Sequence, residues 1–173
     1  TEAGLRGASF KEQPWFLQAA DFFTSCDQLR VLVANLMNVR ADNIALIPAV
    51  SYGVETAALN LPIKSGQKVL LPEGEFPSNV YPWKKDAICF VPRPADYDWT
   101  QAFLEAIDQN TAIVSIPQTD WSDGSHFDLV QISQRAKQVG AALVVDISQS
   151  FGVSSIDVSS FDPDFLFSVG YKW

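Results

Sequence analysis

The chain has 173 residues, of which 47% are hydrophobic, and this is enough for one domain with a buried core. Its formal net charge of −8 argues against a nucleic-acid partner, because phosphate binding needs clustered lysine and arginine. No apolar run approaches the roughly 20 residues that a membrane span needs, and residues 1–4 lack the basic and apolar pattern of a signal segment, so we expect no membrane association.

The two cysteines, Cys26 and Cys89, are too few for a disulfide framework. Cys26 lies on a predicted helix and Cys89 in a predicted strand, and buried free thiols are the expected state of both. This cysteine usage favours a reducing, cytoplasmic location.

The N-terminal region is predicted to be mainly helical. The apolar spacing of residues 29–37 is typical of an α-helix, with Ser25 or Asp27 as its N-cap. The aromatic residues between positions 10 and 23 are expected to pack against other side chains rather than to bind a ligand. Residues 44–47 predict a short strand.

From residue 49 onward, helices and strands alternate. Residues 49–57 predict a turn that opens an alanine-rich helix. Short apolar runs predict strands at residues 68–71, 88–91, 111–116, 143–145 and 165–167. Further helices are predicted at residues 98–107 and 129–139, the second of them capped by Asp128 and ended by Gly140. This alternation, without a repeat or a linker, predicts an α/β domain with a mainly parallel sheet.

Two of the predicted strands end in residues that could serve a cofactor. Asp146 follows one strand directly, and Lys172 follows the last strand. Open parallel sheets bind ligands beyond the carboxyl ends of their strands. A lysine there can form a Schiff base and a carboxylate can keep a pyridine nitrogen protonated, which are the roles that pyridoxal phosphate requires. An N-cap or turn aspartate and an exposed lysine explain the same spacing, so both interpretations are open at this point.

The segments at residues 146–150, 164–166 and 170–173 resemble the class V aminotransferase family of pyridoxal-phosphate enzymes, which includes cysteine desulfurases, kynureninases and relatives of isopenicillin N epimerase. The resemblance covers nearly the whole chain. It implies the large domain of the type I fold of these enzymes, which is a three-layer α/β structure with helices on both faces of a mainly parallel sheet.

The resemblance also implies roles for individual residues around pyridoxal 5'-phosphate. Asp146 would pair with the pyridine nitrogen, and Gln149 would contact the ring hydroxyl. Lys172 would be the catalytic residue that carries the internal aldimine. No metal is expected in this site.

The phosphate of the cofactor has its own set of predicted contacts. The start of the helix near Ser51 could hold a phosphate, although Ser51 could equally be a simple N-cap. The resemblance favours a cofactor-binding role for Ser51, for its neighbour Tyr52 and for Tyr171. Val169 stands where many relatives have a phosphate-binding serine, which removes one contact.

Two loops supply further candidates. Residues 73–83 resemble the family loop that ends in Asn-x-x-Pro-Trp, and Phe76 falls where relatives stack a ring on the pyridine face. Packing of Phe76 onto its own domain is the alternative. Trp121, with Asp120, is placed near the ring by the same resemblance, whereas His126, the only histidine, is expected to be a solvated loop residue.

The resemblance implies a pyridoxal-phosphate-dependent enzyme that acts on an amino acid through an internal aldimine at Lys172, with class V aminotransferase as the leading activity. The alternatives are a kynureninase-like or desulfurase-like lyase, an epimerase, or a non-enzymatic α/β module that keeps the scaffold. A homodimer is expected, since family sites lie at subunit interfaces. Family members are longer, so we expect residues 1–173 to be an incomplete cofactor-binding large domain without the small carboxy-terminal domain.

Overall fold

The computed structural model of the chain describes residues 2–172, which form two compact units, one ending at Leu46 and the other beginning at Ile47. The first unit contains α1 (Glu2–Glu12), α2 (Thr24–Met37) and the short 3₁₀ helices η1 (Pro14–Phe16), η2 (Ala19–Phe22) and η3 (Ala41–Asn43). None of the helices in residues 2–172 combines the length and the apolar character that a bilayer-spanning helix requires.

The helix predicted in the first unit is confirmed as α2, but its start is different. It begins at Thr24 after Phe23, and neither Ser25 nor Asp27 is its N-cap. It ends at Asn38, whose φ of 55° lies in the left-handed region that commonly terminates helices. The strand predicted at residues 44–47 is wrong, because this run has irregular backbone and no strand beside it to complete a ladder.

Side chains that were expected to be buried are exposed in two places. Trp15, Phe16, Phe22 and Phe23 are each more than 60% exposed. The buried-thiol prediction is also wrong: Cys26 and Cys89 are both exposed free cysteines.

The second unit is built on a five-stranded sheet with the order β2-β1-β3-β4-β5, in which every neighbouring pair is parallel. The strands are β1 (Lys68–Pro72), β2 (Ile88–Val91), β3 (Thr111–Pro117), β4 (Ala142–Asp146) and β5 (Phe165–Phe167). All five predicted strands are therefore confirmed to within one residue at each end.

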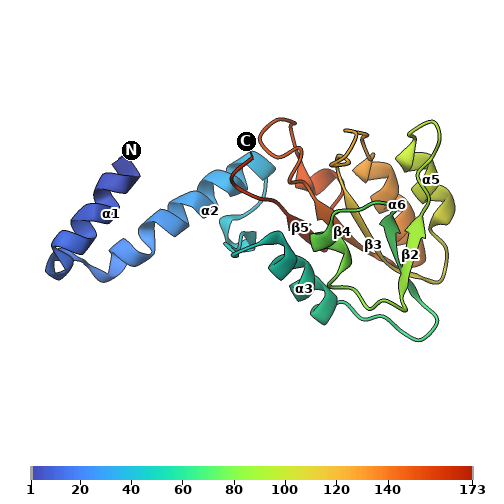
Figure 1. The fold of residues 1–173 in the computed structure, drawn as a ribbon, viewed down its shortest axis with the longest axis horizontal. Helices are drawn as coiled ribbons and strands as arrows, with labels where there is room; N and C mark the ends of the chain where they lie inside the picture. The colour runs from blue at the N-terminus through green and yellow to red at the C-terminus, as the bar shows by residue number, and fades with distance from the viewer. Residues whose placement is uncertain (1, 173) are drawn as a thin grey trace. The chain divides into compact units, whose positions relative to one another are not determined.

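Helices cover both faces of this sheet, as Figure 1 shows. The helix α3 (Val50–Asn60) packs on one face, where its apolar residues join alternate residues of the strands, among them Val69, Val144 and Phe167. The helices α5 (Trp99–Ala106) and α6 (Leu129–Val139) contact the strands from the other face. The short helix α4 (Pro77–Val80) follows β1. The predicted three-layer α/β architecture is confirmed.

Local sequence signals explain where the main helices begin and end. The carboxylates of Asp98 and Asp128 accept hydrogen bonds from the backbone N–H groups three residues later, which caps α5 and α6. Gly140 ends α6 with a φ of 74°, a conformation that costs glycine little. Strong capping at both ends of α6 is why its predicted bounds match the structure.

Candidate functional site

A cavity of about 280 Å³ lies at the carboxyl ends of the strands in the second unit. Its walls come from the segments that follow β1, β3, β4 and β5 and from the first turn of α3. This is the edge of a parallel sheet where ligands are generally bound, because the loops there are free to carry polar groups while the strands stay rigid.

The cavity brings together six of the eight predicted cofactor-binding residues. They are Phe76, Trp121, Asp146, Gln149, Tyr171 and Lys172. Ser51 and Tyr52 lie elsewhere: Ser51 lines a separate surface depression together with Tyr81, and Tyr52 is 58% exposed. His126 is an exposed loop residue, as predicted.

The first turn of α3 contributes its backbone rather than the predicted hydroxyl. Ala49 is the N-cap, so Ser51 is not, and Ala49 and Val50 line the cavity. No side chain caps this helix end, and the first backbone N–H groups of a helix have no partner within the helix. The start of α3 is therefore suited to hold an anionic group.

The Asp146 carboxylate has a fixed orientation at the end of β4. Its Oδ1 accepts a hydrogen bond from the backbone N–H of Ser148 at 2.8 Å, and its Oδ2 accepts one from Nδ2 of Asn79 at 3.0 Å. Asp146 pairs with Phe167 in the register of β4 and β5, so its side chain lies on the face of the sheet that α3 covers. Two donors, one from the helix α4 and one from the loop after β4, thus hold this acid at the cavity wall.

Glu75 is a functional candidate that the sequence reasoning missed. It is only 8% exposed and lines the cavity, and its Oε1 accepts hydrogen bonds from the backbone N–H of Phe76 at 2.6 Å and from Nδ2 of Asn79 at 3.2 Å. Burial raises the pKa of the Glu75 carboxyl to about 7 against the opposing effect of these hydrogen bonds, and the nearby carboxylates of Asp146 and Asp120 add to the rise. Its position inside a loop already assigned to the site was the signal that could have found it.

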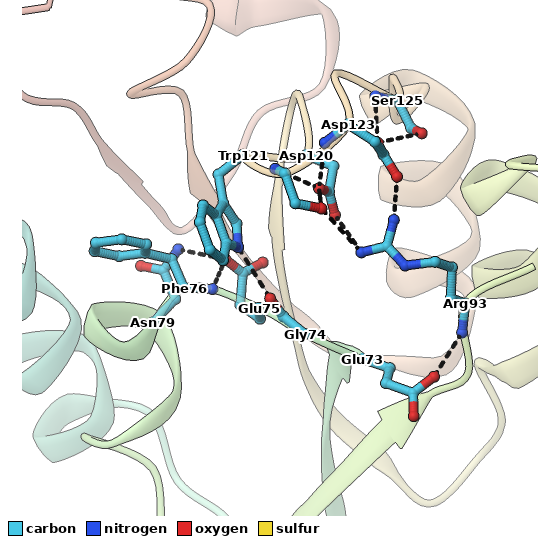
Figure 2. Close-up of polar contacts among 11 residues, drawn as sticks. Glu73, Gly74, Glu75, Phe76, Asn79, Arg93, Asp120, Trp121, Asp123 and Ser125 are labelled. Atoms are coloured by element: carbon cyan, nitrogen blue, oxygen red, sulfur yellow. Dashed lines mark hydrogen bonds and ion pairs between the residues drawn. The ribbon is translucent and has the colours of Figure 1, made fainter.

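An aromatic pair joins two of the loops at the cavity (Figure 2). The rings of Phe76 and Trp121 meet edge to face, with centroids 5.6 Å apart and an angle of 77° between their planes. The indole Nε1 of Trp121 donates a hydrogen bond of 2.9 Å to the carbonyl oxygen of Gly74. The loops after β1 and β3 are therefore tied together where they form the cavity wall.

Behind this wall lies Asp120, which does not itself line the cavity. Its buried carboxylate accepts hydrogen bonds from the backbone and the hydroxyl of Ser122, and the guanidinium of Arg93 lies 3.5 Å from it. Arg93 also contacts Asp123 (Figure 2). Asp120 therefore lies near the site, as predicted, but it stabilises the loop that carries Trp121 and does not line the cavity.

Lys172 and Tyr171 line the cavity from the segment that follows β5, and both are exposed. The same segment is fastened to the loop after β4, because the backbone N–H of Val169 donates to Oγ of Ser148 at 3.3 Å. Gln149, in the loop after β4, is partly buried and lines the same cavity. Asp146 at the end of β4 and Lys172 after β5, the predicted acid and amine, therefore line the same cavity.

The chemical groups around this cavity fit pyridoxal phosphate. An aspartate is available for the pyridine nitrogen, a lysine amine for the aldehyde carbon and an amide for the ring hydroxyl. The uncapped start of α3 is available for the phosphate. Phe76 and Trp121 supply aromatic surface for the ring.

Comparisons with known proteins agree with this fit. Residues 16–173 match the model of the family described as aminotransferase class-V. The chain is 27% identical over 150 residues to a probable cysteine desulfurase of Mycoplasma genitalium, covering 81% of the chain and 37% of that protein. It is 26% identical over 164 residues to a kynureninase of Deinococcus radiodurans, covering 90% of the chain and 38% of that protein.

Solved structures give the same fold. A complex of the cystine C–S lyase C-DES with its reaction product cysteine persulfide superposes with a TM-score of 0.82 at 22% identity, covering 99% of the chain and 49% of that protein. The chain thus spans less than half the length of the relatives it matches. Because the family match covers most of the sequence, the chain belongs to the class V aminotransferase family of pyridoxal-phosphate-dependent enzymes.

Proposed function

We propose that this protein binds pyridoxal 5'-phosphate in the described cavity and uses it to transform an amino acid, with Lys172 as the point of covalent attachment. The observation that carries the proposal is that Asp146 and Lys172, from the ends of two neighbouring strands, line one cavity. When bound, pyridoxal phosphate supplies an electron sink that stabilises negative charge developing at the substrate Cα.

The residues of the cavity take up distinct roles in this proposal. Asp146, held by Asn79 and Ser148, keeps a proton on the pyridine nitrogen through its negative charge. The amine of Lys172 would hold the cofactor and, when free, would move the Cα proton of the substrate as a general base. The side-chain amide of Gln149 orients the cofactor by contacting the hydroxyl group of the pyridine ring.

Other parts of the wall bind and shield. The first turn of α3 holds the phosphate through backbone N–H groups, with Tyr171 close to the same cavity. The pair formed by Phe76 and Trp121 covers the ring and excludes water from it. Ser51 and Tyr52 have no part in this arrangement, since both lie outside the cavity.

Transamination, epimerisation and cleavage of a bond in the side chain of the amino acid are all compatible with these roles. The names of similar proteins (cysteine desulfurase, kynureninase and cystine C–S lyase) favour cleavage. A homodimer, with the site near a subunit interface, is part of the proposal because the family is built in this way.

The experiment uses the full-length protein incubated with pyridoxal phosphate. A visible absorption band should form, and borohydride reduction followed by peptide mass spectrometry should find the phosphopyridoxyl group on Lys172. Lys172→Ala should abolish the band, whereas Lys85→Ala, a change of an exposed lysine outside the cavity, should retain it. Absence of the band in the wild type, or its persistence in Lys172→Ala, would overturn the proposal.

Reaction type is then decided by product. Candidate amino acids are screened for release of sulfide, of alanine or of a keto acid. Sulfide or alanine release identifies cleavage, and keto-acid formation coupled to amination of the cofactor identifies transamination.

A further inference from the structure

The Asn79 side chain bridges two carboxyl groups beside the cavity. Its Nδ2 donates one hydrogen bond to Oε1 of Glu75 at 3.2 Å and another to Oδ2 of Asp146 at 3.0 Å. Asn79 is only 3% exposed, and it joins Glu75, which follows β1, to Asp146, the last residue of β4. Because an amide nitrogen carries two hydrogens in one plane, the acceptor of the first hydrogen fixes the direction of the second.

The surroundings of Glu75 disfavour a negative charge on it. Within residues 2–172, its Oε2 is buried and has no hydrogen-bond partner. Two acidic neighbours act on it from different elements, Asp146 at the end of β4 and Asp120 after β3, and the amine of Lys172 lines the same cavity. A buried carboxylate with one unsolvated oxygen and two acidic neighbours is more stable as the neutral acid.

We propose that Glu75 is a positioning residue for Asp146: as a neutral acid it accepts one hydrogen of the Asn79 amide, so that the other is directed at the Asp146 carboxylate. This inference deepens the proposed function and rests on it, since Asp146 needs a fixed orientation in order to face a cofactor ring. Of the two carboxyl groups that Asn79 joins, neutral Glu75 leaves only that of Asp146 negatively charged.

The consequence is a dependence of cofactor binding on the protonation of Glu75. When Glu75 ionises, the Asn79 amide lies between two negatively charged carboxylates, and their mutual repulsion shifts Asp146 away from its position. Glutamine at position 75 retains an acceptor of the same shape and cannot ionise. Leucine at position 75 removes the acceptor.

The experiment compares the full-length wild type with Glu75→Gln, Glu75→Leu and the matched control Glu55→Gln, which changes an exposed glutamate of α3 outside the cavity. The dissociation constant for pyridoxal phosphate is measured by absorbance titration at pH 6.5 and 8.5. We expect the affinity of the wild type, relative to that of Glu75→Gln, to be lower at pH 8.5 than at pH 6.5. The affinity of Glu55→Gln should change with pH as that of the wild type does. Glu75→Leu should bind about tenfold more weakly at pH 6.5, the size expected for one hydrogen bond to a charged group.

A second readout does not require the cofactor. The side-chain amide protons of Asn79 are followed by NMR in the cofactor-free protein from pH 5.5 to 8.5. They should titrate in the wild type and in Glu55→Gln, and this titration should be absent in Glu75→Gln. A merely structural role of Glu75 predicts lower stability without this pattern.

The outcomes separate the inference from the function on which it rests. If no variant, including the wild type, binds pyridoxal phosphate, the proposed function falls and the Asn79 signals alone decide the positioning role. Equal cofactor affinity in Glu75→Leu and the wild type, or an Asn79 titration that persists in Glu75→Gln, would overturn the inference. If Glu75→Leu does not fold, the comparison of Glu75→Gln with the wild type decides.

Discussion

The guanidinium of Arg93 lies 3.5 Å from the buried carboxylate of Asp120, although Arg93 follows β2 and Asp120 follows β3. Arg93 also donates to Oγ of Ser122 at 3.1 Å and lies over the ring of Trp99, 5.4 Å from its centroid. These contacts hold the loop that carries Trp121, and Trp121 packs against Phe76 at the cavity (Figure 2). A cation outside the cavity thus supports the aromatic wall within it.

Arg93→Ala should destabilise the second unit. It leaves the Asp120 carboxylate buried without its cation, a change that costs about 3–5 kcal/mol for fully buried pairs. Because the Arg93 side chain is 32% exposed, we expect a smaller loss of about 2 kcal/mol in the free energy of unfolding, measured by urea denaturation. Arg40→Ala, which removes an exposed partner of Asp42, is the control and should change stability by less than about 0.5 kcal/mol. Equal effects of the two substitutions would contradict the supporting role of Arg93.

Gly53 lets α3 approach β5 closely. A Cβ added at Gly53 would lie 2.6 Å from the ring of Phe167 and 2.8 Å from Cδ1 of Ile47. Gly53→Ala should therefore lower the free energy of unfolding by about 1–3 kcal/mol through overpacking, even though alanine favours helix. Gly7→Ala is the opposite case, since a Cβ at this exposed position in α1 meets nothing within 4 Å, and it should stabilise its helix by about 0.5–1 kcal/mol. A stabilised Gly53→Ala would show that α3 can move away from the sheet without cost.

The parts of the fold that were predicted correctly have strong local signals. A strand buried on both faces of a parallel sheet has a continuous apolar run, and all seven residues of β3 are buried. The helix α6 carries its own stop signal in Gly140. Residues 44–47 have the same apolar character as a strand, but only the tertiary structure shows that no strand pairs with them. The exposure of Cys89 likewise follows from the place of β2 at the edge of the sheet.

That Asp146 and Lys172 line one cavity could be predicted, because each residue lies at or after the end of a strand in a parallel sheet. The bridge through Asn79 was missed because its hydrogen bond from Asn79 to Asp146 joins residues 67 positions apart in the sequence, a separation that no local pattern reveals. The assignment of Ser51 to the site did not consider which face of the helix α3 carries this residue. The buried stripe of α3 includes Val50, Gly53, Val54 and Ala57, and a rotation of about 100° per residue turns Ser51 and Tyr52 away from it.

Asp146→Asn should separate folding from chemistry. Asparagine retains only one of the two acceptor oxygens that receive hydrogen bonds from Asn79 and Ser148, so the free energy of unfolding should fall by about 1–3 kcal/mol. The protein should still fold, but the charge that keeps the pyridine nitrogen protonated is lost. We expect the exchange of the Cα proton of an amino-acid substrate with solvent deuterium, followed by NMR in the full-length protein with pyridoxal phosphate, to slow by about 10²-fold or more. Asp86→Asn, at an exposed position outside the cavity, is the control. Unchanged exchange in Asp146→Asn would remove Asp146 from the proposed mechanism.

The raised pKa of Glu75 predicts how stability depends on pH. The pKa of Glu75 is about 7 in the folded protein against 4.5 for an ordinary glutamate, so between these values the unfolded chain binds fewer protons than the folded one. The contribution of Glu75 is therefore fully present below about pH 4.5 and is lost as pH rises to about 7, by up to about 3 kcal/mol. Residues such as Asp128, whose pKa is lowered mainly by hydrogen bonds from Gln131, act in the opposite direction and at lower pH, so they do not obscure this window. Urea denaturation of the cofactor-free protein at pH 5, 6, 7 and 8 should show that the free energy of unfolding of the wild type and of Glu55→Gln declines as pH rises. In Glu75→Gln this decline should be smaller by the same amount. Parallel curves for the wild type and Glu75→Gln would mean that Glu75 ionises as freely in the folded protein as in the unfolded chain.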